Sequence, residues 1–269
     1  YQKTELHYLL SLQKKDFQWK INGTYSANRN KVIELTDILP NIILQNGPGS
    51  RGAIIAYVGG SMGDLYGRGY LRSPNGDIIY ENGIPQLGAE MQYIGNTNPE
   101  WRASINNEFR YKQFRASFLF DAQVGAVAYS LTAANLANQG KTKNTLPGRY
   151  NGIIGKGVID NGDGTFRPND YIAENIWDYY NAHLGNDNVE GTSYSTDFLK
   201  LREARLDYSL SPKQLSKIGL TRATIGVFGR DLFMWTAWPV FDPECGTLGA
   251  SDINKGSELG QMPSTRTFG

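Results

Sequence analysis

Hydrophobic and polar residues alternate along several segments of the chain. From residue 17 to residue 28 the apolar side chains hold odd positions and the polar side chains even ones. The same alternation recurs in 114–124, where Leu119 departs from it. A period of two residues is typical of a β-strand with one apolar face, whereas an amphipathic helix repeats every 3.6 residues. The pattern predicts about seven strands, at 6–12, 17–27, 101–110, 114–124, 199–210, 223–232 and 265–269.

The lengths of the strands and of the connections favour a barrel in a membrane. The strands are about ten residues long, as a tilted membrane strand requires. Tight turns follow residues 12 and 110, whereas the connections at about 28–100, 126–197 and 233–264 far exceed the usual four to six residues. Short turns that alternate with long loops are typical of outer-membrane barrels. Trp101 and Trp235 are expected at the outer interface of the membrane.

A soluble sandwich also shows alternating strands, because its sheets bury one face and expose the other. The alternative interpretation is therefore a secreted, soluble β-protein that binds or cleaves glycans. Equally, the alternation fits apolar side chains toward lipid and polar side chains toward a wet lumen.

Composition removes several other classes. The 269 residues carry 27 Lys and Arg against 26 Asp and Glu, so there is no basic surface for a nucleic-acid partner. No segment reaches the roughly 18 apolar residues of a membrane-spanning helix. Two His and one Cys exclude a disulfide framework and a Cys/His zinc cluster, and no cofactor is predicted. Cys245 is expected to be a free, inert thiol.

Five motifs, in order along residues 95–269, resemble the SusC-like (RagA-type) TonB-dependent transporters of Bacteroidetes. Gly95–Trp101 resembles the family's GNxxPxW entry to a late hairpin. Gly229–Phe233 resembles its GxNLF strand end, with Asp231 in place of the commoner Asn. The other three segments are Phe198–Pro212, Phe241–Glu244 and Pro263–Gly269.

The resemblance implies an all-β fold, with residues 1–269 forming the C-terminal part of a 22-stranded, plugged transmembrane barrel. The plug domain and the TonB box of such proteins would lie outside this chain. It also implies an outer-membrane nutrient importer without enzymatic activity. Its implied partners are a SusD-like surface lipoprotein, TonB, and an oligosaccharide or oligopeptide substrate.

Two groups of residues are candidates for function. Polar residues on the barrel strands are expected to face the lumen: Arg115, Asp121, Gln123, Glu203, Arg205 and Asp207. Aromatic and acidic residues of the long loops are candidates for contact with substrate or partner, because aromatic faces stack on sugars and peptides: Trp177, Asp178, Tyr179, Tyr180 and Trp238. Glu174 and Asp178 are four positions apart on an expected helix, but nothing there tunes a pKa for glycoside hydrolysis.

A glycine-rich turn carries the weak candidates for a metal, Asp160 and Asp163. An EF-hand loop needs an oxygen ligand at its third position and a Glu at its twelfth, where this chain has Gly162 and Tyr171. The default prediction is therefore a tight turn in which the aspartates bond the backbone.

Overall fold

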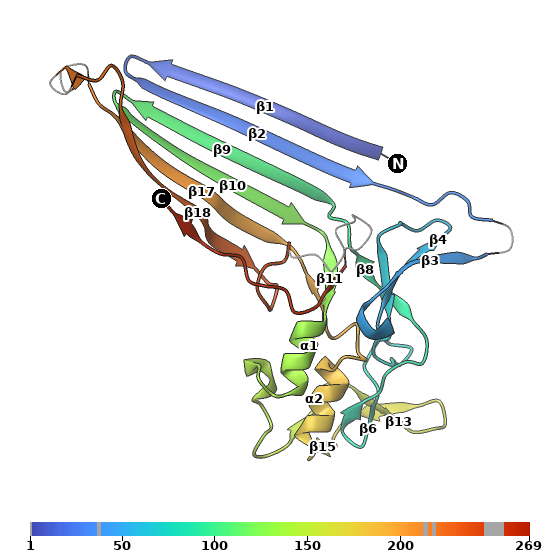
Figure 1. The fold of residues 1–269 in the computed structure, drawn as a ribbon. Helices are drawn as coiled ribbons and strands as arrows, with labels where there is room; N and C mark the ends of the chain where they lie inside the picture. The colour runs from blue at the N-terminus through green and yellow to red at the C-terminus, as the bar shows by residue number, and fades with distance from the viewer. Residues whose placement is uncertain (1, 37–38, 212–214, 217–218, 245–255) are drawn as a thin grey trace.

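The computed structural model describes residues 2–36, 39–211, 215–216, 219–244 and 256–269. Its largest element is a curved antiparallel sheet, in which the strands lie side by side in the order in which they occur along the chain (Figure 1). The strands, in spatial order, are β1 (Gln2–Lys14), β2 (Phe17–Arg29), β9 (Trp101–Tyr111), β10 (Phe114–Val124), β17 (Phe198–Ser209), β18 (Thr224–Thr236) and β20 (Thr267–Phe268). The predicted all-β fold, a portion of an antiparallel barrel, is confirmed.

One face of this sheet is apolar along its whole width. The register places Trp19 opposite Phe109 and Phe109 opposite Ala116, so apolar side chains continue from strand to strand. The rings of Trp19 and Phe109 stack with centroids 5.7 Å apart. These side chains remain open: Leu6 and Val227 are 60% and 62% exposed. Among the described hydrophobic residues of the long strands, Phe198 alone is buried, so no second sheet covers this face as it would in a soluble sandwich.

Aromatic residues mark both ends of the strands. Trp101 pairs with Val124, and Trp235 with Leu199, at the end where the long connections begin. Tyr111 and Tyr208 both lie opposite Phe114 at the end with the short turns. Aromatic side chains at both levels are typical of membrane interfaces.

The short turns are as tight as predicted. Lys14 pairs with Phe17, and Tyr111 with Phe114, so each turn has two residues. In both turns the first residue is a lysine with positive φ, 51° at Lys15 and 52° at Lys112. Two-residue turns with positive φ match the right-handed twist of the strands they connect.

The long connections are not irregular. The described residues of 30–100 and 125–197, together called the loop unit, form small sheets, two α-helices and two 3-10 helices (Pro48–Ser50 and Lys143–Thr145) at one end of the strands (Figure 1). The α-helices are α1 (Leu131–Asn138) and α2 (Ile176–Leu184). A four-stranded sheet contains β3 (Asn41–Asn46), β4 (Ala53–Tyr57), β5 (Asp64–Gly67) and β8 (Gln92–Asn96), and the shorter strands are β6 (Tyr80–Glu81), β7 (Ile84–Pro85), β11 (Val127–Ser130), β12 (Ile153–Ile154), β13 (Val158–Asp160), β14 (Phe166–Pro168), β15 (Ile172–Ala173) and β16 (Ser193–Ser195). A strand from outside the loop unit, β19 (Ser257–Glu258), pairs with β11 in parallel.

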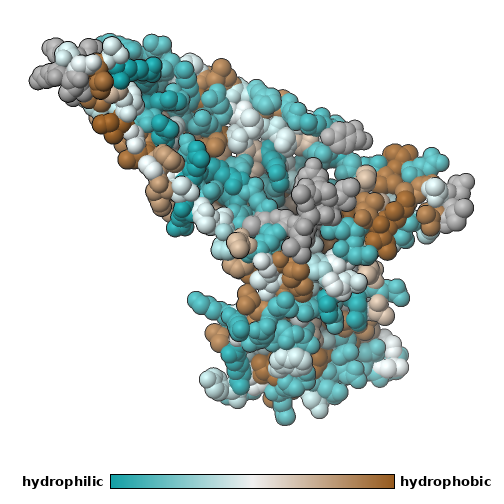
Figure 2. Space-filling view, viewed as in Figure 1, coloured by the Kyte–Doolittle hydropathy of each residue, from teal (hydrophilic) through white to brown (hydrophobic). Residues whose placement is uncertain are grey.

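The buried core lies mostly in the loop unit. One cluster joins Leu65, Tyr129 and Val189, and a second is centred on Tyr80 and Tyr179. Figure 2 shows hydrophobic surface gathered over β3 and β4, whereas the lower part of the loop unit is mostly polar.

Within the described residues, no helix has the length and apolar character to cross a membrane. Cys245 lies outside the described residues.

Candidate functional site

The polar face of the sheet collects the six residues predicted to face the lumen. The register pairs Arg115 of β10 with Asp207 of β17, and Asp121 with Lys200. Glu203 lies opposite Leu119 between these two pairs. All of these positions alternate with the apolar ones. The structure therefore brings the predicted residues together on one surface, opposite the exposed apolar face: Arg115, Asp121, Gln123, Glu203, Arg205 and Asp207.

Ion pairs between arginine and glutamate side chains cover the middle of this polar face. Arg115 bonds Glu108 of β9 at 2.6 Å, and Arg230 of β18 bonds Glu203 at 3.0 Å. A cavity of about 320 Å³ is lined in part by Glu108, Arg115 and Glu203. Because positive and negative groups alternate and stay partly exposed, each pair contributes little to stability. Neither positive nor negative charge dominates this part of the surface.

A buried charged network lies nearer the loop end of the sheet. The Nζ of Lys200 donates to Asp242 at 2.6 Å and also bonds Glu244, and the two side chains of the first pair are 4% and 9% exposed. Arg202 donates to Asp121 at 2.7 Å and bonds the same Glu244. These five residues, called the Lys200 network, hold the segment after β18 against the polar face of β10 and β17.

A β-bulge explains why Lys200 and Arg202 serve the same network. The pairing shifts register between Leu201 and Glu203, so Arg202 is the extra residue of the strand. The matching extra residues on β18 include Asp231, which has φ 52° and lies 3.8 Å from Arg202. A bulge redirects side chains at the rim of a barrel, and here it adds a second cation to the polar face.

The carboxyl group of Asp242 is ionised by this environment. Burial alone would raise its pKa, but hydrogen bonds from Lys200 and from the backbone N–H of Glu244, with the charge of Lys200, outweigh burial and lower the pKa. The carboxylate of Asp242 is thus held in its charged form as the partner of Lys200.

The loop unit is fastened to the strands at the same level. Gln123 donates to the hydroxyl of Thr196 at 2.9 Å, and the N–H of Gly125 donates to Asp197 at 2.7 Å. The hydroxyl of Thr236 donates to the carbonyl of Asp197 at 2.7 Å. Three strand ends therefore meet at residues 196–197, where the second long connection returns to the sheet.

The centre of the loop unit is a histidine enclosed by tyrosines. The hydroxyl of Tyr70 lies 2.9 Å from Nδ1 of His183, and that of Tyr80 lies 3.1 Å from Nε2. The ring of Tyr179 is 4.5 Å from the imidazole. Burial lowers the pKa of His183 to about 4, so the ring is neutral near pH 7. The cluster ties β6 and the region of Tyr70 to α2, and it is a structural core rather than an open catalytic centre.

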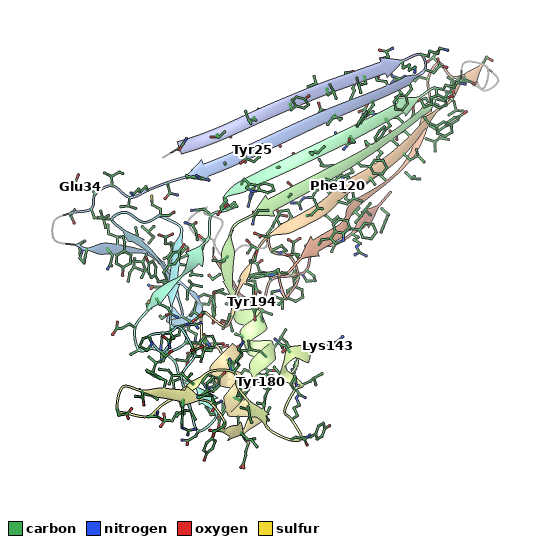
Figure 3. All side chains as sticks on the ribbon, turned by 180° about the vertical axis from the view of Figure 1, so that it is seen from behind. Tyr25, Glu34, Phe120, Lys143, Tyr180 and Tyr194 are labelled. Carbon is green, nitrogen blue, oxygen red and sulfur yellow. The ribbon has the colours of Figure 1, made fainter. Side chains whose placement is uncertain are left out.

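Four of the loop candidates lie together on α2. Asn175 caps the helix by accepting from the N–H groups of Trp177 and Asp178. Asp178 in turn accepts from the Asn175 side chain at 2.5 Å. Tyr179 and Tyr180 are buried, whereas Trp177 is 56% exposed. Figure 3 shows Tyr180 within the loop unit, and its hydroxyl donates to the carbonyl of Pro147 at 2.8 Å.

The fifth candidate, Trp238, lies elsewhere. It is buried and packs edge-on against Tyr194, with centroids 6.1 Å apart. The structure therefore places it by β16, at the base of the loop unit, and not with the group on α2.

The two metal candidates form ordinary turn contacts. Asp160 accepts from the N–H of Gly162 at 2.8 Å, and Asp163 from the N–H of Thr165 at 2.9 Å. Hydrogen bonds from Thr165 lower the pKa of Asp163. Within the described ranges, no group of three or more His, Cys, Asp or Glu residues could hold a metal ion.

The sequence pattern did not identify the cations of the Lys200 network or the two cations that lie near Trp177. Lys200 and Arg202 were visible in the FLKLR motif and Asp242 in the FDPE motif, but alternation alone does not show that these segments meet. Lys141 and Arg149 are also near the exposed Trp177, where a cavity lies between the two helices. No periodic signal marks them, because they occupy a turn.

Comparisons with known proteins agree with the sequence motifs. No protein-family model matches the chain. TonB-dependent receptor P3 of Formosa agariphila is 24% identical over 96% of this chain and 27% of its own length. TonB-dependent receptor P26 of the same organism is 23% identical over 94% of this chain and 26% of its own length. The chain thus spans about a quarter of these relatives.

The fold is similar to that of solved RagAB structures. The RagAB peptide transporter matches with a TM-score of 0.64 and 14% identity, over 99% of this chain and 28% of that one. The closed–closed state of the RagAB peptide importer matches with a TM-score of 0.62 and 14% identity, over 98% of this chain and 28% of that one. The resemblance to SusC-like (RagA-type) TonB-dependent transporters is therefore confirmed.

Proposed function

We propose that this chain, with its RagA-like fold and its similarity to TonB-dependent receptors, is part of an outer-membrane importer. Residues 1–269 would form the C-terminal part of its barrel domain. In this role the strands contribute a wall between lipid and lumen, and the loop unit projects from the outer end. In this role the residues perform no bond chemistry.

The observation that carries this proposal is the two-faced sheet. Apolar side chains such as Tyr8 and Ile225 are 63% and 67% exposed, while the opposite face holds the ion pairs. The apolar face would be unstable in water, but an acyl-chain environment covers it. The 13-residue strands β1, β2 and β18 exceed the roughly nine to eleven residues needed to cross the hydrocarbon layer at a tilt.

The substrate we propose is an oligosaccharide or an oligopeptide. The solved neighbours include a peptide importer, and the exposed indole of Trp177 suits a sugar or a peptide. The partners we propose are a SusD-like surface lipoprotein over the loop unit and TonB, which supplies energy from the inner membrane. Asp178, Tyr179, Tyr180 and Trp238 are proposed to support or contact these partners.

The test is uptake by cells that carry the full-length transporter. We expect the protein in the detergent-soluble outer-membrane fraction, and uptake of labelled oligomers that stops when TonB is deleted. Protease added to whole cells should cut within 30–100 and 125–197 and spare the strands. Recovery of the protein in the detergent-free secreted fraction would contradict the proposal and favour a soluble glycan-binding protein.

A further inference from the structure

A cavity of about 720 Å³ lies where the end of α1 meets the start of α2. This volume falls within the roughly 300–1,000 Å³ typical of small-ligand sites. Residues 139–149 close one side of it, and the first turn of α2 closes the other. The lining residues are Ala137, Asn138, Gln139, Gly140, Lys141, Thr145, Arg149, Ile176, Trp177 and Tyr180.

The charge of this cavity is positive. Its lining contains Lys141 and Arg149 and no carboxylate. Arg149 is fixed, since it donates to the carbonyls of Thr145 and Gly140 at 2.9 and 2.6 Å. The carbonyls of Asn135, Leu136 and Ala137 at the end of α1 accept from the backbone N–H groups of residues 139–141. Among the described residues, none forms a hydrogen bond or an ion pair with the ammonium group of Lys141, so this group is available to an anion.

The wall opposite the cations is aromatic. The indole of Trp177 is 56% exposed, whereas Tyr180 beneath it is buried and held by its bond to Pro147. Exposing the apolar surface of an aromatic ring to water is unfavourable, so this ring is suited to a ligand with a flat apolar face. Asn138 donates to Asn181 at 2.7 Å and keeps its carbonyl oxygen for another donor.

We propose that this cavity binds an anionic sugar unit, a uronate or a sulfated residue within an oligosaccharide. The C–H face of the sugar ring would stack on Trp177, its acid group would pair with Lys141, and its hydroxyls would bond Asn138 and Gln139. An extended peptide is less suited, because peptide recognition uses an exposed strand edge or an apolar groove, and this cavity is formed by helix ends and a turn. The biological use of the site rests on the proposed import function.

Binding is measured by calorimetry on the full-length transporter in detergent. The probes are a uronate trisaccharide, a sulfated disaccharide, a neutral trisaccharide and a triglutamate peptide. We expect an anionic sugar to bind and the neutral one to bind about two- to fivefold more weakly, because the acid group pairs with an exposed lysine. Trp177→Ala should weaken anionic-sugar binding by up to about tenfold, and Lys141→Ala should weaken it about two- to fivefold.

Lys143→Ala is the matched control, because Lys143 is an exposed lysine two positions away that does not line the cavity (Figure 3). It should bind like the wild type. The inference is overturned if neither anionic sugar binds, if the neutral sugar binds equally well, if Lys141→Ala and Lys143→Ala behave alike, or if triglutamate is the ligand that Trp177→Ala loses. A separate uptake assay distinguishes the two proposals, since sugar binding without uptake would refute the importer and leave the site intact.

Discussion

Removing the ammonium group of Lys200 should release the segment after β18 from the wall. In Lys200→Met the carboxylate of Asp242 stays 9% exposed but loses its cation. It keeps only neutral donors, among them the N–H of Glu244. Breaking a buried ion pair by removing one partner costs about 3–5 kcal/mol. The lower figure applies here, because Glu244 is partly exposed.

A loss of about 3 kcal/mol in local stability raises the population of molecules in which the segment after β18 is released roughly a hundredfold. Chymotrypsin reports this opening through cleavage after Phe241, which lies in the held segment. When opening is fast relative to cleavage, the cleavage rate follows the open population. We therefore expect the rate at this bond to rise roughly a hundredfold in detergent, as measured by mass spectrometry of the fragments.

Arg230→Met provides the matched control. The pair of Arg230 and Glu203 is on the same face but is 61% and 32% exposed, so its loss should cost about 0–1 kcal/mol. Adding Asp242→Asn to Lys200→Met should recover much of the loss, because the unpaired buried charge disappears. Equal cleavage in the Lys200 and Arg230 variants would refute the assignment of a buried, stabilising network.

Three further predictions concern the strands and the loop unit. Phe118→Arg places a charge toward the acyl chains and should cost about 2–4 kcal/mol in a refolding titration, whereas Ser117→Arg on the polar face should be much milder; equal costs would contradict the assignment of faces. His183 has an ordinary pKa of 6.5 in the unfolded chain, and burial lowers this pKa to about 4 in the folded protein. Between pH 6.5 and about 4 the unfolded chain therefore binds more protons than the folded protein, and stability falls as the pH falls through that window. His183→Gln should flatten that pH dependence in urea unfolding, and an unchanged slope would count against the cluster. Asp231→Val should lower stability by about 1–2 kcal/mol because φ is 52°, whereas Asp231→Asn should have little effect; similar unfolding curves for the two would exclude strain at the bulge.

The alternation of side chains was sufficient to predict the large sheet. A strand with one face in lipid must repeat every two residues, so the sequence itself carries the signal over ten or more positions. The two-residue turns at Lys15 and Lys112 followed from the distance between neighbouring runs. The ends were less certain: β18 continues to Thr236, four residues beyond the predicted end, because the bulge at Asp231 interrupts the alternation.

The loop unit could not be predicted in the same way. Its strands are two to six residues long, which is too short to show a sustained period. α1 was missed because its eight residues include several small alanines and no clear apolar stripe. The helix expected near Glu174 was found at 176–184, where Asn175 provides the cap. Which distant segments meet, as Tyr70 and Tyr80 do at His183, is decided by tertiary packing alone.

The position of the Lys200 network bears on how the loop unit could use a ligand. Residues 196–197 bond to the ends of β10 and β18, and Lys200 holds the segment after β18 through Asp242. The returning connections are thus fixed to strands that a membrane would make rigid. A cavity on such a support keeps its geometry when it is empty, which lowers the entropic cost of binding. Ligand recognition by the cavity near Trp177 is therefore expected to be preorganised.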